Sequence, residues 1–334
     1  MDNKIKYKVT VSCMTYNQAK YITDAMNGFT MQQTSFPFVC TIVDDASTDG
    51  EQEVIRRYVE DNFDFSEGSV AYHKETDYAH ITYAQHKTNK NCYFAVLYLK
   101  ENHYSKHKDK SPYFKDWRDG VEYMAICEGD DYWIVPDKLE KQVKFLDENE
   151  DYGMCFTANK RLDEESGTVK IDKKIDGDIN FDKLLKGNMI ATLSSIFRQK
   201  IYNMYIKEIN PIQKDWLLGD YPLWLYIAYN SKIYCNSDIT SVYRMVKGSA
   251  SNQTSYRKYL KYIDSTYDIK LFYIYKYNLP NKLREKTLAE MHYRRAGVLV
   301  ANRQYCQALC EVRDSKMNLF LFIERIIKIL FGKN

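Results

Sequence analysis

The sequence predicts an α/β fold in which helices flank a mostly parallel sheet. Two apolar runs, residues 9–14 and 38–43, have the length and the β-branched content of fully buried strands. Each run is followed by a segment whose apolar residues have helical spacing, residues 18–33 and 51–62. Strands that alternate with helices in this way form parallel sheets through crossover connections.

Acidic side chains follow directly after two of the predicted strands. Asp44 and Asp45 come after residues 38–43, and Glu128, Asp130 and Asp131 come after the apolar run 123–127. Ligands of open α/β sheets bind at the carboxyl ends of the strands. Crowded carboxylates repel one another unless a cation lies between them, so the pattern predicts a hard divalent metal, Mn²⁺ or Mg²⁺.

The remaining segments have weaker patterns. We expect a short strand at 70–73, helices at 93–102, 136–149 and 216–229, an exposed lysine-rich loop at 104–117, and a helical pattern from about 256 to 334.

Composition limits the classes of function. A length of 334 residues suits one large α/β domain with an appendage, or two small domains, and a formal charge of +3 is too small to indicate nucleic-acid binding.

Three of the eight cysteines, Cys13, Cys40 and Cys127, lie in predicted buried strands, as reduced core thiols do. We read the pair Cys306 and Cys310 as core thiols as well. With no signal-peptide pattern and no apolar run near 20 residues, we expect a cytoplasmic protein.

Residues 317–331 form an apolar segment too short to span a bilayer, with Glu324, Arg325 and Lys328 among its few charges. Two interpretations stay open. A helix of this kind lies on the inner face of a membrane as a peripheral contact, or it packs against the protein body or a partner.

Phosphate-binding loops of the two common kinds are absent from the sequence, since neither G-x-x-x-x-G-K-[ST] nor G-x-G-x-x-G occurs after the first strand. Three segments, residues 9–17 (VTVSCMTYN), 41–50 (TIVDDASTDG) and 125–142 (AICEGDDYWIVPDKLEKQ), resemble the inverting family 2 glycosyltransferases with the GT-A fold. The likeness is greatest to bacterial enzymes of capsule, lipopolysaccharide or exopolysaccharide assembly, and it covers residues 7–250.

This resemblance implies a domain organisation. Residues 1–250 would form a Rossmann-like GT-A domain, with a nucleotide-binding half at 1–135 and an acceptor half at 136–250. Residues 251–334 would form a helical C-terminal extension.

The resemblance also implies roles for single residues. Thr15, Tyr16 and Asn17 would form part of the nucleotide-binding loop, Asp44 and Asp45 would meet the base and ribose, and Ser47 would belong to the same pocket. The family's D-x-D element corresponds to Glu128-Gly129-Asp130, with Asp130 as the metal ligand, Glu128 facing the ribose or the metal, and Asp131 adjacent. Glutamate at the first position reaches one methylene further than the family's usual aspartate.

Asp220, in the segment 216–224 (WLLGDYPLW), matches the family's catalytic base, which takes the proton from the acceptor hydroxyl. A second interpretation is that Asp220 caps the helix that follows it, and Asp215 is the nearest rival as base. Arg244 and Lys247 match a segment near the donor diphosphate, where they would offset phosphate charge, or they form surface salt bridges. Residues 188–195 would help to shape the acceptor side.

The sequence therefore predicts a hexosyltransferase-like enzyme that transfers a sugar from a nucleotide diphosphate, by preference a UDP-sugar, to a glycan or lipid-linked acceptor. Two alternatives stay open: a metal-dependent phosphohydrolase, and a catalytically inactive glycan-binding or scaffold protein. The haloacid-dehalogenase pattern D-x-D-x-[TV] is not met by residues 44–48.

Overall fold

The structure is a computed structural model that describes residues 5–172, 175–246 and 255–314. Their contacts divide them into two compact units. The first unit holds residues up to 209 together with 226–245, and the second holds residues 210–225 together with those from 246 onward. The boundary therefore crosses one helix, α7 (Asp220–Asn230).

Thirteen strands of the described residues form a single sheet in the first unit. They are β1 (Val9–Thr15), β2 (Phe38–Asp44), β3 (Phe63–Asp64), β4 (Tyr72–Glu75), β5 (Ala79–His86), β6 (Cys92–Leu99), β7 (Tyr123–Ile126), β8 (Tyr132–Trp133), β9 (Tyr152–Asp163), β10 (Val169–Ile171), β11 (Gly177–Asp178), β12 (Ser195–Arg198) and β13 (Lys232–Met245). The strand order is β11-β13-β9-β12-β7-β1-β2-β6-β5-β3, with β10 beside β9, β4 beside β5 and β8 beside β13.

The centre of the sheet is parallel, because β7, β1, β2 and β6 run in the same direction. Antiparallel strands flank this centre on both sides, β5 next to β6 and β12 next to β7. The predicted α/β fold is confirmed, and the predicted first two strands each continue one residue further, to Thr15 and Asp44. Every residue of β2 is buried, as the unbroken apolar run indicated.

The helices of the first unit are α1 (Ile22–Thr30), α2 (Glu51–Asn62), α3 (Lys115–Arg118), α4 (Lys138–Glu148), α5 (Phe181–Lys186), α6 (Gln199–Ile209) and the later part of α7, with short 3₁₀ turns η1 (Ser111–Phe114) and η2 (Thr192–Ser194). The second unit contains η3 (Pro211–Gln213), α8 (Tyr256–Lys276), α9 (Asn281–Ala301) and α10 (Tyr305–Asp314).

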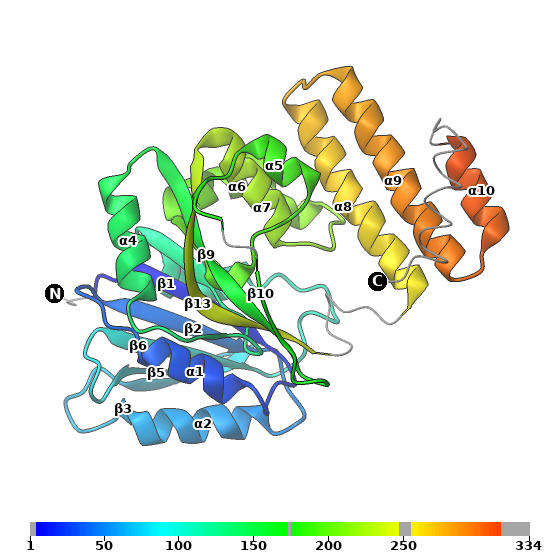
Figure 1. The fold of residues 1–334 in the computed structure, drawn as a ribbon. Coiled ribbons are helices and arrows are strands. Elements are labelled where there is room, and N and C mark those ends of the chain that lie inside the picture. Colours follow the sequence, from blue (N-terminus) through cyan, green and yellow to red (C-terminus); the bar gives the residue numbers. More distant parts are fainter. Residues whose placement is uncertain (1–4, 173–174, 247–254, 315–334) are drawn as a thin grey trace. The chain divides into compact units, whose positions relative to one another are not determined.

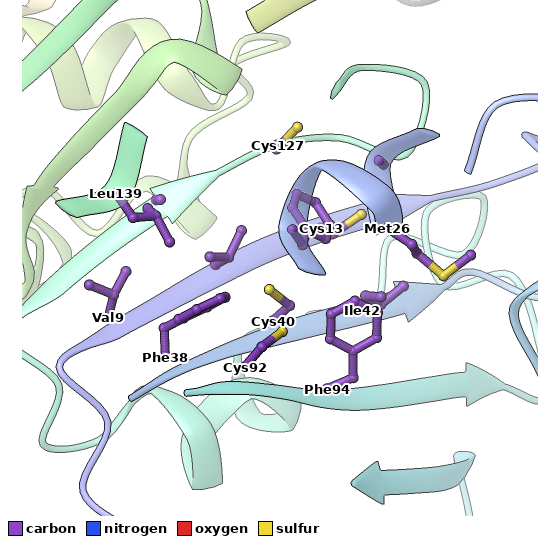
Figure 2. Close-up of a cluster of buried hydrophobic side chains, with 14 of the residues drawn as sticks. Val9, Cys13, Met26, Phe38, Cys40, Ile42, Cys92, Phe94, Cys127 and Leu139 are labelled. Atoms are coloured by element: carbon purple, nitrogen blue, oxygen red, sulfur yellow. The ribbon is translucent and has the colours of Figure 1, made fainter. Parts of the chain in front are cut away.

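One face of the parallel strands forms a core with α1, α2 and α4 (Figure 1). Alternate residues of each strand point to this face, since side chains of a strand alternate between its two sides. Figure 2 shows Cys13 of β1, Cys40 of β2 and Cys92 of β6 in this apolar layer, next to Met26 of α1. All four are fully buried, so the prediction of reduced core thiols is confirmed for Cys13 and Cys40.

Two predictions of local structure are wrong. The expected helix at 93–102 is strand β6, whose eight residues are all buried and pair with β2 and β5. A short apolar run rich in aromatic and β-branched residues fits a buried strand as well as a helix, and the neighbouring strands decide between them. Cys306 and Cys310 of α10 are exposed rather than in a core.

In the second unit, α8, α9 and α10 are joined by charged side chains. Arg295 of α9 donates from Nε to Glu311 of α10 at 2.7 Å and also pairs with Asp264 of α8. The predicted helical pattern is confirmed for residues 256–314, whereas the apolar segment 317–331 lies outside the described residues. Across residues 5–172, 175–246 and 255–314, no helix has both the length and the apolar character that crossing a membrane requires.

Candidate active site

Three loops meet at the carboxyl edge of the parallel strands. Thr15, the last residue of β1, lies opposite Asp44, the last residue of β2. On the other side of β1, the loop after β7 follows the same edge, because the backbone N–H of Gly129 donates to the carbonyl of Met14 at 3.1 Å. The structure thus brings together the residues that the sequence placed after three different strands.

The loop after β1 and the loop after β2 hold each other through hydrogen bonds. The backbone N–H of Asn17 donates to Ser47 Oγ at 2.9 Å, and the N–H of Thr48 donates to Asn17 Oδ1 at 2.8 Å. Asn17 and Ala46 both have positive φ, 54° and 60°. Residues other than glycine adopt this conformation rarely and often at functional sites, where the surrounding contacts enforce it.

Asp44 and Asp45, both predicted to meet the nucleotide, have internal partners. The N–H of Ser47 donates to both carboxylate oxygens of Asp44 at 3.3 Å, and burial raises the pKa of this carboxyl group. Asp45 is 2% exposed and accepts hydrogen bonds from the backbone of His103 at 2.7 Å and of Tyr104 at 3.0 Å. Its charge is matched by Lys110, whose Nζ lies 2.9 Å from Oδ2.

Asp45 therefore fixes the lysine-rich segment, predicted as an exposed loop, against the edge of the sheet. The segment contains η1 and α3, and Lys110 contacts the carboxylate with a side chain that is only 19% exposed. Sequence reasoning could not pair these two residues, because 65 positions separate them.

The loop after β7, residues 127–131, is called the acidic loop below. Its glycine, Gly129, allows it to lie close to β1. A Cβ atom on this residue would lie 2.3 Å from Thr15 Oγ1, 2.5 Å from Gln18 Oε1 and 2.7 Å from Thr15 Cβ. Any side chain would push the loop away from Thr15, so only glycine permits this approach.

Negative charge accumulates at this point of the acidic loop. Burial raises the pKa of Asp130, and it raises the pKa of Asp131 well above its usual value, with the charges of Asp130 and Glu128 adding to the second effect. Glu128 accepts a hydrogen bond from Thr192 Oγ1 at 2.8 Å, so η2, within the predicted acceptor-side segment 188–195, lies against the first acid.

Arg244 is enclosed by partners instead of projecting into open space. Its Nε donates to Glu164 at 2.9 Å, its Nη1 donates to the backbone carbonyl of Asp130 at 2.9 Å, and its Nη2 pairs with Asp24. The guanidinium also lies over the ring of Tyr132, 4.4 Å from its centre. With its side chain 6% exposed, Arg244 is placed to hold the acidic loop, and contact with a diphosphate stays a prediction.

The three acids of the loop after β7 fit a divalent cation that takes most of its ligands from substrate phosphates and water. In the part of the chain that the structure describes, no three His, Cys, Asp or Glu side chains converge as a ready cage. Asp131 is committed to Arg244 and Glu128 to Thr192, which leaves Asp130 as the most available of the three predicted ligands. Mg²⁺ and similar ions are held by one or two carboxylates together with substrate phosphates and water.

The remaining predicted residues are Asp220, its rival Asp215, Tyr16 and Lys247. Asp220 is the first residue of α7, is half-buried and belongs to the second unit, where burial raises the pKa of Tyr262 and the charge of Asp220 raises it further. Its rival Asp215 is exposed. Tyr16 is 46% exposed beside the predicted nucleotide loop, and Lys247 lies outside the described residues.

Glu51 is the functional candidate that sequence reasoning missed. It is fully buried as the first residue of α2, and its carboxyl group contacts Thr15, the backbone N–H of Gln18 and Ser47 Oγ. The only signal in the sequence is its position one residue after Gly50, whose φ of 91° turns the chain into the helix.

No family model matches the chain. Uncharacterized proteins of Mycobacterium tuberculosis and Mycobacterium bovis are 31% identical over 215 residues, which is 63% of this chain and 52% of theirs. The chain thus spans about half the length of these relatives. TuaG of Bacillus subtilis, provisionally designated a teichuronic acid biosynthesis glycosyltransferase, is 25% identical over 248 residues, 73% of this chain and 81% of TuaG.

Among solved structures, S. aureus TarS 1–349 in complex with UDP-GlcNAc aligns with a TM-score of 0.53 at 14% identity, over 92% of this chain and 89% of that one. The mannosyltransferase PcManGT of Pyrobaculum calidifontis, in complex with GDP-Man and Mn²⁺, aligns with a TM-score of 0.54 at 14% identity, over 98% and 88%. The fold is that of the GT-A glycosyltransferases. The GT-A fold predicted from three motifs is confirmed, and the likeness to TuaG supports the predicted class of enzyme.

Proposed function

We propose that this GT-A protein transfers a sugar from a nucleotide diphosphate, by preference a UDP-sugar, to a hydroxyl group of a glycan or lipid-linked acceptor in bacterial surface polysaccharide synthesis. The observation that carries the proposal is the meeting of three loops at one edge of the sheet, where the segments after β1 and β2 lie against the acidic loop after β7. This is the edge at which open α/β sheets bind ligands.

Two proteins of the same fold support the nature of the donor. TarS holds UDP-GlcNAc and PcManGT holds GDP-Man with Mn²⁺. In this chain Thr15, Asn17 and Ser47 offer small polar groups on two interlocked loops, which suits a nucleoside. Asp44 accepts hydrogen bonds from the N–H of Ser47, burial raises the pKa of its carboxyl group, and its remaining oxygen lone pairs can meet the base.

A divalent cation, Mn²⁺ or Mg²⁺, would be held by Asp130 with Glu128 and Asp131 nearby, and it would offset the negative charge of the departing diphosphate. The chain itself prepares this position. Gly129 allows the loop to approach Thr15, while Arg244 fixes the loop from the other side through the Asp130 carbonyl. Rigid support of this kind lowers the cost of ordering the site when the donor binds.

Transfer with inversion requires a base that removes the proton of the acceptor hydroxyl as its oxygen attacks the anomeric carbon. We assign this role to Asp220 because of its match to the family motif and because it stands at the start of α7. The positive end of the helix dipole favours the ionised carboxylate there. A base must be ionised before it can accept a proton.

The test is a thermal-unfolding screen of nucleotide sugars with and without Mn²⁺. A ligand at about 100 times its Kd stabilises a protein by about 2.7 kcal/mol, which is readily measured. We expect a UDP-sugar to raise Tm only when Mn²⁺ or Mg²⁺ is present, and the same sugar to be hydrolysed slowly without an acceptor. If no nucleotide sugar or nucleotide shifts Tm under either condition, the proposal is wrong.

A further inference from the structure

Glu51 lies beneath the two loops that the proposed function assigns to the donor. Its carboxyl Oε1 contacts the hydroxyl of Thr15, while Oε2 accepts the backbone N–H of Gln18 at 2.9 Å and the hydroxyl of Ser47 at 2.8 Å. One buried side chain therefore connects the end of β1, the loop after β1 and the loop after β2.

The hydrogen atoms available to Thr15 reveal the state of this carboxyl group. The Thr15 hydroxyl carries one hydrogen, yet its oxygen contacts two acceptors, Gln18 Oε1 at 2.8 Å and Glu51 Oε1. The structure places the amide oxygen of Gln18, and not its amide nitrogen, toward Thr15. An amide oxygen has no hydrogen to give, and Thr15 must donate to it. The remaining contact needs a hydrogen on Glu51.

We propose that Glu51 is held as a neutral carboxylic acid and acts as a positioning residue for the donor site. Its Oε1–H donates to Thr15, and Thr15 donates to the amide oxygen of Gln18. Oε2, the carbonyl oxygen of the acid, accepts the two remaining bonds, so each of these groups has a partner of the right kind. These bonds join a buried acid to the two loops that are predicted to bind the nucleotide.

The charged surroundings agree with a neutral acid. Asp44 at the end of β2, Asp49 in the loop before α2 and Asp130 beyond Gln18 are acidic, and Cys13 of β1 is a buried thiol. Burial raises the pKa of Glu51, and the charge of Asp44 raises it further. An ionised Glu51 would add another negative charge to this group and would leave two acceptors facing each other across Thr15.

The first experiment needs no ligand and compares the unfolding of the wild type and Glu51→Gln between pH 4 and 9. The glutamine amide can supply the N–H for Thr15 and the oxygen for Gln18 and Ser47, but it does not titrate. The stabilisation from a neutral acid is complete below the unfolded pKa of about 4.3 and is lost as the pH rises toward the raised folded pKa. Across that window the unfolding constant of the wild type should rise relative to the variant by up to about tenfold per pH unit.

The exposed Glu53 on the same helix provides the matched control. Glu53→Gln should change stability by an amount that is constant from pH 5 to 9. A constant difference between the wild type and Glu51→Gln over the same range would show that Glu51 is ionised and would overturn the proposal. So would a Glu51→Gln protein that does not fold, because the amide fits every bond that the neutral acid makes.

The second experiment tests the positioning role and rests on the proposed function. We expect the affinity for UDP with Mn²⁺, measured by calorimetry and expressed as the ratio of wild type to Glu51→Gln, to fall across the pH range in which the first experiment shows Glu51 losing its proton. A constant ratio would remove the link to the donor site. If UDP binds neither protein, the proposed function fails, while the unfolding experiment still decides the state of Glu51.

Discussion

The backbone N–H of Arg244 donates to Asp131 Oδ1 at 2.7 Å and so joins two segments that are 113 residues apart. The Arg244 side chain contacts the same loop again through the Asp130 carbonyl at 2.9 Å. Strand β13 therefore fixes the acidic loop at two successive residues. The geometry of the predicted metal ligand depends on an arginine that need not touch the donor.

Replacing Arg244 with lysine should destabilise the first unit by about 2 kcal/mol, because a single ammonium group cannot reproduce the separate contacts to Asp24, Glu164 and the Asp130 carbonyl. Chemical denaturation measures this change. Arg161→Lys is the control, since the Arg161 pair with Asp172 is more exposed and should contribute less than about 1 kcal/mol. Equal losses for both variants would contradict the role given to Arg244.

A methyl group at position 129 should disturb the site directly. Gly129→Ala places a Cβ 2.3 Å from Thr15 Oγ1, and relief of such overpacking costs about 1 to 3 kcal/mol. UDP affinity should fall with stability, because the loop that carries Asp130 must move away from β1. At Gly187 a Cβ meets no atom within 4 Å, so Gly187→Ala should leave both properties nearly unchanged. If Gly129→Ala had the stability and the UDP affinity of the wild type, the acidic loop would not need its close approach to Thr15.

Asp130→Ala should abolish metal-dependent nucleotide binding and leave the fold intact. The carboxylate supplies an oxygen ligand to a cation that also needs the donor phosphates, so its loss removes both charge and geometry. Calorimetry with UDP and Mn²⁺ measures the effect, and removal of the metal from the wild type should have the same result. Asp137→Ala, which removes an exposed carboxylate paired with Lys141, is the control. Equal UDP affinity in the wild type and Asp130→Ala would exclude Asp130 as the ligand.

The parts of the fold that could be predicted are those with a strong local pattern. Helix α2 was predicted with its observed bounds, because the acidic turn before it and the apolar positions Ile55 and Val59 give both a start and a buried face. Strand β6 was predicted as a helix, because nothing in an apolar run of eight residues records that β2 and β5 lie on its two sides. Local sequence does not contain the identity of strand neighbours.

The same distinction between local pattern and distant contact applies to the candidate site. The residues after β1, β2 and β7 were found because strand ends and motifs mark them in the sequence. Their partners were not, since the bonds from Thr15 to Glu51, from Lys110 to Asp45 and from Arg244 to Asp131 join residues separated by 36, 65 and 113 positions. These contacts decide which acids are committed to the fold and which are available to a ligand.

The assignment of the base is tested by Asp220→Asn. We expect this variant to bind the donor as the wild type does and to lose turnover by a factor of about 10² or more, the usual scale when a general base is removed. Asparagine is a good residue at the start of a helix, so α7 should remain intact and the stability should barely change. A steady-state transfer assay with a matched UDP-binding measurement separates loss of chemistry from loss of binding. Asp215→Asn, at an exposed position five residues earlier, is the control and should turn over normally. If the outcomes are reversed, Asp215 is the base and Asp220 has only a structural role at the start of the helix.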